Sequence, residues 1–193
     1  MKTLIFNGSP RPHGDTAYLI SRLRQALPGE VKEIRAYAAK VKPCVDCRYC
    51  WSHSGCCIPD EMQQIYDDIR EADLIVIASP VYFSGLTGML MAMMSRLQMF
   101  YANRRFQKNE PITKVKQGAI LLVGGGEGGP KHAEATARML LRGMKVKGDI
   151  PVVMSLATDS RPAKEDAEAC AAVDALAASM KKAEDAKSSS IFD

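Results

Sequence analysis

Short apolar runs alternate along this chain with longer segments in which apolar residues recur every three or four positions. The first pattern predicts strands, and the second predicts helices that pack by one face. The run 74–78 is entirely apolar, which is typical of a strand covered on both faces. We expect strands at 2–6, 31–35, 74–78, 118–123 and 152–156, and helices at 15–26, 60–71, 85–100, 130–145 and 163–182.

Because each expected strand is followed by a helix, the pattern predicts an α/β domain with a parallel sheet and helices on both faces. We expect a single domain over 1–193, a polar loop over 101–116 and a frayed polar tail over 184–193. In such sheets ligands bind beyond the carboxyl ends of the strands, where the strand order reverses. The loops that follow the first, third and fourth expected strands are 8–15, 79–85 and 124–129.

The composition is that of an ordinary globular protein, with a net charge of +4 and charges of both signs interspersed. It contains no basic run interleaved with aromatic residues, so we expect no nucleic-acid partner. The most apolar helical segment is too short and too interrupted to span a membrane, and the N-terminus lacks the features of a signal peptide. We therefore expect a cytoplasmic protein with no membrane contact, in which six cysteines indicate metal or redox chemistry rather than disulfides.

The first loop, 8–15, joins an apolar strand to a helix through small and hydroxyl-bearing residues. The first N–H groups of a helix lack internal partners and carry partial positive charge, so they favour an anion. Ser9 and Thr16 offer hydroxyl donors and Arg11 a full charge, which suits a phosphate monoester. The alternative is an ordinary turn with Asp15 as the N-cap. The loop matches neither the dinucleotide fingerprint nor the P-loop.

The other two loops suit a flat ligand. Tyr82 and Phe83 are adjacent aromatic residues after a buried strand, which indicates that they face a flat ligand or a partner. The alternative is that they pack into the core or a subunit contact. The loop 124–129 contains five glycines, which allow a close approach of the backbone to a ligand but also make a flexible turn. Together the three loops favour a phosphorylated heterocycle over a bare phosphate.

These loops resemble those of the flavodoxin-like NAD(P)H-dependent FMN reductases. The matching elements are Gly8-Ser9-Pro10-Arg11 with Gly14-Asp15-Thr16, Ala78-Ser79-Pro80-Val81-Tyr82-Phe83, and the glycine-rich loop, within residues 1–145. The resemblance implies a three-layer sandwich with the strand order 2-1-3-4-5. It departs from the family at Asp15, where an Asn is frequent and where a carboxylate does not suit a phosphate. The FMN contacts that it implies are Ser9, Arg11, Asp15 and Thr16 for the phosphate and Pro80, Val81, Tyr82 and Phe83 for the ring, with Ala17, Gly125 and Gly126 as further contacts.

A cysteine-rich loop over 43–59 contains the spacing Cys44-x2-Cys47-x2-Cys50-x5-Cys56. Four thiolates so spaced suit an iron–sulfur cluster or structural zinc, and the alternative is a loop of free thiols at a subunit contact. Cys57 is then a spare thiol, and Cys170 a small buried hydrophobe. The motif resembles that of the iron–sulfur flavoprotein branch of the same superfamily, which implies that Cys44, Cys47, Cys50 and Cys56 ligate a [4Fe–4S] cluster.

The resemblance implies an FMN-dependent oxidoreductase that takes electrons from NAD(P)H or a one-electron carrier. FMN and the cluster would pass them to a small-molecule or protein acceptor. The alternatives are a cluster-free quinone, azo or flavin reductase, a non-enzymatic flavodoxin-like carrier, and a zinc-stabilised binding or sensing module. No side chain stands out as a general acid or base, so we name no catalytic residue. The family also implies a homodimer or homotetramer.

Overall fold

The computed structural model describes the backbone of residues 1–189 and the side chains of residues 1–182. Its strands are β1 (Lys2–Asn7), β2 (Glu30–Arg35), β3 (Leu74–Pro80), β4 (Gln117–Val123) and β5 (Val152–Ser155). They form one five-stranded sheet in the order β2-β1-β3-β4-β5, and every pair is parallel. Both the strand order and the parallel pairing confirm the flavodoxin-like arrangement predicted from the sequence.

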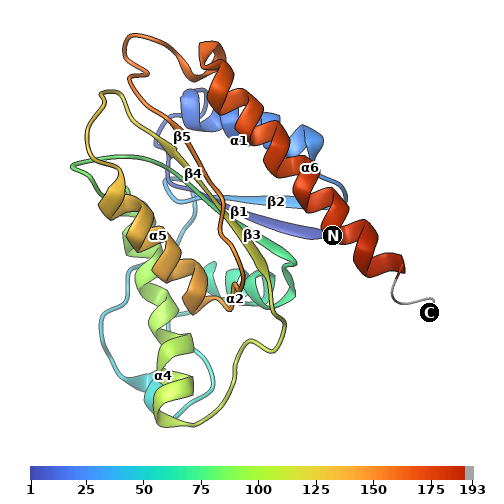
Figure 1. The fold of residues 1–193 in the computed structure, drawn as a ribbon. Helices are drawn as coiled ribbons and strands as arrows, with labels where there is room; N and C mark the ends of the chain where they lie inside the picture. The colour runs from blue at the N-terminus through green and yellow to red at the C-terminus, as the bar shows by residue number, and fades with distance from the viewer. Residues whose placement is uncertain (190–193) are drawn as a thin grey trace.

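Helices cover both faces of the sheet (Figure 1). The helices are α1 (Asp15–Ala26), α2 (Met62–Glu71), α3 (Gly88–Met94), α4 (Gln98–Phe106), α5 (Lys131–Gly143) and α6 (Ala167–Ser189), with 3₁₀ turns η1 (Tyr49–Trp51), η2 (Ser95–Leu97) and η3 (Ala163–Glu165). One apolar core lies between the sheet and α1 with α6, and the other lies between the sheet and α2 to α5. The molecule is therefore the three-layer sandwich that the resemblance implies.

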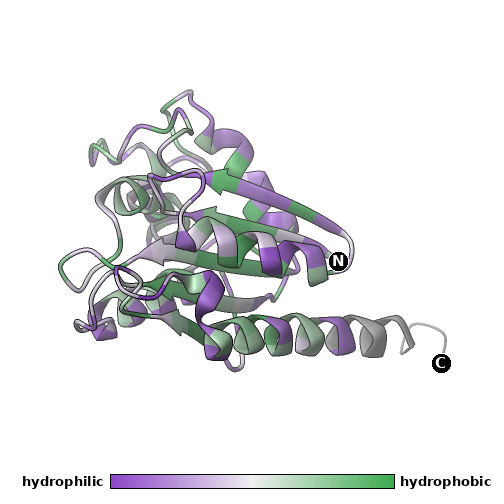
Figure 2. Cartoon of the chain, turned by 90° about the horizontal axis from the view of Figure 1, so that it is seen from above, coloured by the Kyte–Doolittle hydropathy of each residue, from purple (hydrophilic) through white to green (hydrophobic). Residues whose placement is uncertain are grey.

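The sequence explains which strands are central. The apolar part of β3 is fully buried, as is most of β4, because helices cover both faces of these strands. At the edge, β2 alternates charged and apolar residues and is only half-buried. Figure 2 shows the same contrast, with green central strands and a mixed edge strand. Among the described residues no helix is both long enough and apolar enough to cross a membrane.

The expected helix over 85–100 is wrong in detail, because the helix is interrupted at η2. The Ser95 hydroxyl donates to the Ala92 carbonyl (2.6 Å), and back-bonds of this kind slightly destabilise and bend a helix. The same Ser95 oxygen accepts the backbone N–H of Cys44 at 2.9 Å. The 3₁₀ turn therefore lies where this helical segment contacts the cysteine-rich loop.

The expected loop over 101–116 is also wrong in its first part, because α4 continues to Phe106. The polar side chains that suggested a loop instead bind the cysteine-rich loop. Asn103 and Gln107 both donate to the carbonyl of Cys50, at 3.0 and 2.8 Å. Tertiary hydrogen bonds thus stabilise a helical turn that its local composition does not favour.

The C-terminal helix begins and ends later than expected. The turn η3 occupies 163–165, and α6 then continues to Ser189, past the predicted end at 182. Of the predicted frayed tail over 184–193, residues 184–189 belong to the backbone of α6, and residues 190–193 lie outside the described residues.

A buried lysine at the start of β4 makes stability depend on pH. Lys116 is only 2% exposed, and its ammonium donates to the carbonyls of Arg70 (3.1 Å) and Lys114 (2.9 Å). Burial, with the nearby charge of Lys114, lowers the pKa of Lys116 from 10.5 to about 8. Between these values the unfolded chain binds the proton that the folded chain has lost, so stability rises with pH.

We expect the free energy of unfolding to rise by on the order of 2 kcal/mol between pH 8 and pH 10.5 because of Lys116. The variant Lys116→Met should lack this contribution. Urea unfolding at several pH values in this range measures the free energy of unfolding of both proteins. Subtracting one pH profile from the other removes the contribution of other groups that titrate in the same range. Parallel pH profiles for the two proteins would contradict the assignment.

Candidate functional site

The loops selected from the sequence meet at the carboxyl end of the sheet (Figure 1), where they line a cleft of about 240 Å³. The lining residues are Ser9, Pro10, Arg11, Gly14, Asp15, Thr16, Pro80, Val81, Tyr82, Val123, Gly125, Thr158 and Asp159. Most of the predicted FMN contacts therefore lie around one cavity. Three do not line it, namely Ala17, Phe83 and Gly126.

One end of the cleft is the N-terminus of α1. Gly14 is the N-cap and no side chain caps the helix, so the alternative that Asp15 is the N-cap is wrong. Thr16 is almost fully buried beside the free N–H groups of the first turn, and Arg11 is exposed at the rim. The Ser9 hydroxyl accepts the backbone N–H of Arg11 and donates to the Arg11 carbonyl, both at 3.2 Å, which holds the loop in its curve. This end combines backbone, hydroxyl and guanidinium donors for an anion.

Asp15 lines the cleft, but its carboxylate already has a partner. Its Oδ1 accepts the backbone N–H of Ala163 at 2.7 Å, which ties α1 to the segment that follows β5. This bond explains how a carboxylate is accommodated at the anion-binding end, since it is directed at a neighbouring N–H group.

The loop after β3 forms the opposite wall. The backbone N–H of Val81 donates to Val123 at 2.8 Å, and Tyr82 and Gly85 exchange backbone hydrogen bonds across a tight turn. The two residues inside this turn, Phe83 and Ser84, have φ angles of 49° and 64°. Left-handed backbone is costly for residues other than Gly or Asn, so this turn is strained.

The strained turn is hydrogen-bonded to α5 and leaves the ring of Phe83 exposed. The carbonyl of Ser84 accepts the N–H of Ala133 at 2.8 Å, and this caps the first turn of α5. The side chain of Phe83 is fully exposed beside the cleft and does not pack into the core. The alternative in which Phe83 packs into the core is therefore wrong.

Because Phe83 packs against nothing, its replacement by Asn should stabilise the protein. Asn tolerates left-handed backbone, so Phe83→Asn should raise the free energy of unfolding by about 0.5–1 kcal/mol. The matched control is Phe83→Ala, which removes the ring but keeps the backbone preference and should give no such gain. Denaturant unfolding of the apoproteins measures both, and a less stable Phe83→Asn variant would contradict this explanation.

The glycine-rich loop is held by the segment after β5. Its carbonyls at Gly124, Gly125 and Gly126 accept N–H groups of Thr158, Asp159 and Ala157, at 3.0 to 3.1 Å. A Cβ on Gly125 would lie 2.6 Å from a carboxylate oxygen of Asp159, so this glycine permits a close approach. Sequence analysis missed Thr158 and Asp159, although the carboxyl end of the fifth strand was a signal that could have identified them.

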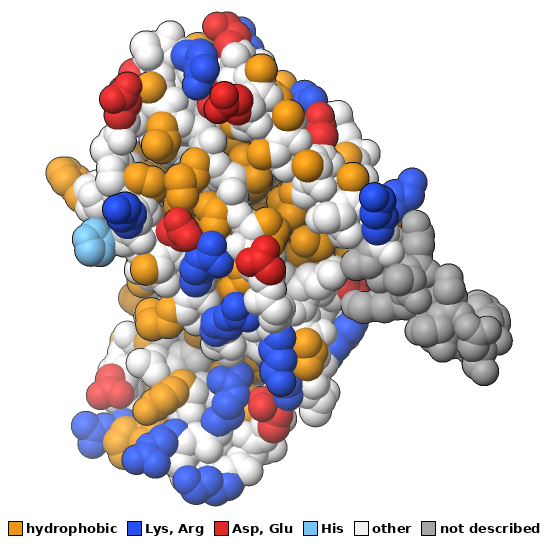
Figure 3. All heavy atoms as spheres, in the orientation of Figure 1, with side chains coloured by type: hydrophobic (Ala, Val, Ile, Leu, Met, Phe, Trp, Pro, Cys, Tyr) orange, Lys and Arg blue, Asp and Glu red, His pale blue; other side chains and the backbone are white. Residues whose placement is uncertain are grey.

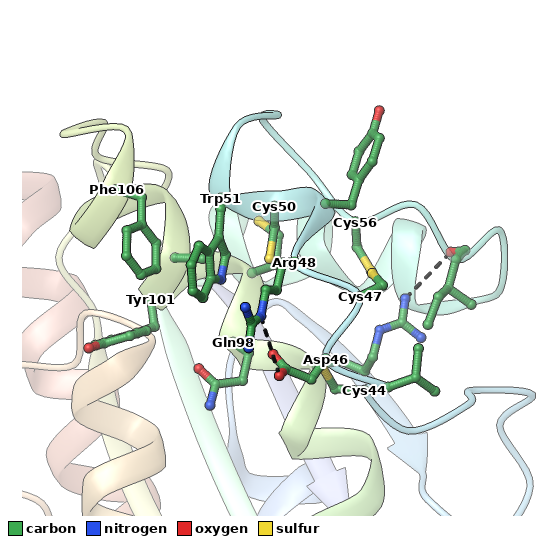
Figure 4. Close-up of a pocket in the computed structure, with 16 residues that line it drawn as sticks. Cys44, Asp46, Cys47, Arg48, Cys50, Trp51, Cys56, Gln98, Tyr101 and Phe106 are labelled. Atoms are coloured by element: carbon green, nitrogen blue, oxygen red, sulfur yellow. Dashed lines mark hydrogen bonds and ion pairs between the residues drawn. The ribbon is translucent and has the colours of Figure 1, made fainter.

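The four cysteines of the motif line a second cavity, of about 190 Å³, between the cysteine-rich loop and α4 (Figure 4). Burial raises the pKa of Cys50, and the charges of Cys56, Cys44 and Cys47 raise it further, so these thiols lie within electrostatic reach of one another. A backbone hydrogen bond from Tyr49 lowers the pKa of Cys47. The spare thiol of Cys57 lies 3.4 Å from that of Cys47.

Aromatic residues close one side of this cysteine cavity. Trp51 stacks on Phe106 with ring centroids 4.1 Å apart, and the guanidinium of Arg48 lies over the Trp51 ring. Tyr49 stacks on His53, which is exposed. Cys170 lies elsewhere and is buried in α6, as expected.

Within the described residues, no group of three or more His, Cys, Asp or Glu side chains is arranged to hold a single metal ion. A [4Fe–4S] cluster makes a different demand, because each thiolate binds a different iron at the corners of a cube. Thiols spread around a cavity fit that demand better than they fit one zinc ion. The donor set, four cysteines around one space, therefore suits the cluster.

Residues 1–159 match the family model described as NADPH-dependent FMN reductase. The chain belongs to this family. An iron-sulfur flavoprotein of Methanocaldococcus jannaschii is 35% identical over 99 residues, which are 50% of this chain and 51% of that protein. An iron-sulfur flavoprotein of Methanosarcina thermophila is 30% identical over 155 residues, which are 77% of this chain and 78% of that protein. Both the resemblance to FMN reductases and its iron–sulfur flavoprotein branch are confirmed.

The chain spans only 51% to 66% of the length of three iron-sulfur flavoproteins that it matches, two from Methanocaldococcus jannaschii and one from Archaeoglobus fulgidus. Among solved structures, an FMN-dependent NADH-azoreductase of Bacillus anthracis in complex with FMN has a TM-score of 0.68 to this FMN reductase family member. The two are 13% identical, and the alignment covers 93% of this chain and 99% of that one. At this identity the likeness supports the flavodoxin-like fold alone.

Proposed function

We propose that this FMN reductase family member is an FMN-dependent oxidoreductase whose flavin lies in the cleft at the carboxyl end of the sheet. The observation that carries the proposal is the meeting of an open helix N-terminus with two further loops around one cavity. FMN has a phosphate at one end and a flat ring at the other, and the cleft offers a matching surface for each. Family membership supports the same assignment.

In this proposal the phosphate lies at the N-terminus of α1. Ser9, Arg11 and Thr16 would contribute donors, together with the backbone N–H of Ala17 in the first turn. Ala17 does not line the cleft by its side chain, so its contact would come from the main chain. Asp15 would act indirectly, by holding the segment after β5 through Ala163.

The ring would lie against the segment Pro80 to Tyr82 and the glycine-rich loop. Val81 is held to β4 by its backbone, so this wall is rigid and needs little ordering when a ring binds. Gly125 lines the cleft directly, whereas Gly126 supports it through the hydrogen bond that it accepts from Ala157. Phe83 would act at the edge of the ring, where its exposed side chain is free to contact a co-substrate or a second subunit.

FMN accepts a hydride from a reduced nicotinamide and passes electrons on singly or in pairs, so the protein's task is to bind and orient. We infer NAD(P)H or a one-electron carrier as the donor, and a small molecule or a protein as the acceptor. A homodimer or homotetramer is part of the same proposal. It is supported by the exposed aromatic side chains of Tyr82 and Phe83 beside the cleft.

We further propose that Cys44, Cys47, Cys50 and Cys56 hold a [4Fe–4S] cluster. Their common cavity and the relatives described as iron-sulfur flavoproteins support this assignment. The second candidate is a cluster-free quinone, azo or flavin reductase. It is supported by membership of a family described as NADPH-dependent FMN reductase, since reduction of an acceptor through FMN requires the cleft alone.

Steady-state turnover with an artificial acceptor tests the oxidoreductase, and metal analysis of the same anaerobic sample separates the two candidates. We expect oxidation of NADH or NADPH that depends on FMN, together with bound iron and acid-labile sulfide. Turnover without iron would support the cluster-free reductase. The absence of turnover in FMN-loaded protein, with either nicotinamide and with a reduced one-electron carrier, would contradict the oxidoreductase itself.

A further inference from the structure

An arginine is buried at the interruption between α3 and α4. Arg96 lies in η2, and its side chain is 0% exposed. It lines the same cavity as the four cysteines of the motif. A fully buried guanidinium is costly unless it is paired and hydrogen-bonded, so each of its N–H groups requires an acceptor.

Two of the three guanidinium nitrogens have acceptors on the segments that flank the cysteines. Nη1 donates to Asp60 Oδ2 at 2.7 Å and to the carbonyl of Lys42 at 2.9 Å. Nη2 donates to the carbonyl of Ile58 at 3.4 Å. Asp60 also accepts the backbone N–H of Lys42, so the pair joins the start of the cysteine-rich loop to its end.

The third nitrogen, Nε, is buried and has no hydrogen-bond partner among the described residues. An unpaired N–H on a charged group is costly when it is buried, and native proteins rarely leave one without an acceptor. The four cysteines line the same cavity as Arg96, so a sulfur of the proposed cluster is a candidate acceptor for this N–H. Burial acts to lower the pKa of Arg96, but the hydrogen bond to Asp60 raises it overall, so the guanidinium keeps its positive charge.

We propose that Arg96 provides a hydrogen bond from Nε and a fixed positive charge to the cluster held by the four cysteines, and thereby raises its reduction potential. The inference rests on the proposed cluster. Hydrogen bonds to sulfur and local charge are the features by which a protein sets such a potential. A cluster with four thiolates is negatively charged, and a nearby cation favours the form with one more electron.

A purely structural role for Arg96, in joining the ends of the loop, makes a different prediction. Arg96→Gln and Asp60→Asn both break the same ion pair, so structural loss would move the potential in the same direction in both. In our proposal the shifts have opposite signs, because one variant removes a positive charge and the other a negative charge. The reduced and oxidised cluster would be measured by anaerobic potentiometric titration with electron paramagnetic resonance.

We expect Arg96→Gln to lower the equilibrium constant for one-electron reduction of the cluster at least tenfold, which corresponds to ~59 mV. Asp60→Asn should raise it. Arg96→Lys retains the charge but lacks the Nε donor, so its potential should lie between those of the wild type and Arg96→Gln. The matched control is Arg138→Gln on α5, which breaks an ion pair with Glu134 away from this cavity and should leave the potential unchanged.

Shifts of the same sign in Arg96→Gln and Asp60→Asn, or no shift in either, would overturn the inference while the cluster stands. If Arg96→Gln fails to retain iron, the sign of the shift in Asp60→Asn decides, since an upward shift supports the inference and any other result overturns it. Wild-type protein without iron after anaerobic reconstitution would instead overturn the cluster, and the inference with it.

Discussion

Cys47→Ser is expected to abolish iron incorporation in anaerobically prepared protein. Cys47 lines the cavity with Cys44, Cys50 and Cys56, and a serine hydroxyl at one corner is a much poorer ligand for iron than a thiolate. Iron and acid-labile sulfide per chain are the measurement. Reconstituted variant protein with the wild-type iron content would contradict Cys47 as a ligand.

The neighbouring thiol of Cys57 provides a control variant, but it could also replace Cys47 as a ligand. Cys57→Ser removes a cysteine from the same loop, but Cys57 does not line the cavity, so this variant should retain its iron. Because the Cys57 sulfur lies 3.4 Å from that of Cys47, it could replace the lost ligand in Cys47→Ser. The double variant Cys47→Ser/Cys57→Ser closes that route. Iron retained by the double variant would show that this corner of the motif is not a ligand.

The second prediction concerns how much the phosphate of FMN contributes to its affinity for the protein. We expect the apoprotein to bind FMN at least about 100-fold more tightly than riboflavin, which lacks the phosphate, because several hydrogen bonds to a charged group would be lost together. The open N-terminus of α1, with Thr16 and Arg11, supplies those bonds. Quenching of flavin fluorescence measures both affinities, and equal affinities would contradict an anion-binding role for this loop.

Thr16→Val tests the contact with the phosphate separately from the contacts with the ring. Thr16 is almost fully buried, so valine fills the same space while removing one hydroxyl donor. The variant should lose about 1 kcal/mol of affinity for FMN and nothing for riboflavin. A loss that is equal for both flavins would mean that Thr16 supports the fold of the cleft and makes no bond to phosphate.

The sheet could be predicted because its signals are local. Apolar runs such as that in β3 identify central strands, and the order follows from the resemblance in the first loops. The helix after β3 could not be predicted in detail, because its interruption and its extension both depend on distant partners. Ser95 binds Cys44, and Asn103 binds Cys50, across loops whose placement no periodicity reveals.

In the candidate site too, some residues could be predicted from the sequence and others could not. Ser9, Thr16 and Gly125 follow strands in sequence and Pro80 ends β3, so the parallel sheet alone brings them to one edge, and all four line the cleft. Asp159 was missed because its strand lies at the edge of the sheet, away from the point where the strand order reverses. The exposure of Phe83 follows from a strained turn that binds α5, which local sequence does not reveal.

The cysteine motif illustrates a further limit. Its spacing identified four thiols that the structure does bring to one cavity. Nothing in that spacing identified Arg96, in η2, or Asp60, just before α2, which together join the two ends of the loop. The environment of a candidate cluster is built by tertiary contacts, even where its ligands are adjacent in sequence.

The most direct test of the whole account is the absorption spectrum of protein purified without oxygen, recorded with iron, sulfide and flavin assays on the same sample. The account predicts bound FMN together with iron and sulfide in equal amounts, four of each per chain, as a [4Fe–4S] cluster requires. Colourless protein that takes up neither FMN nor iron on reconstitution would contradict it.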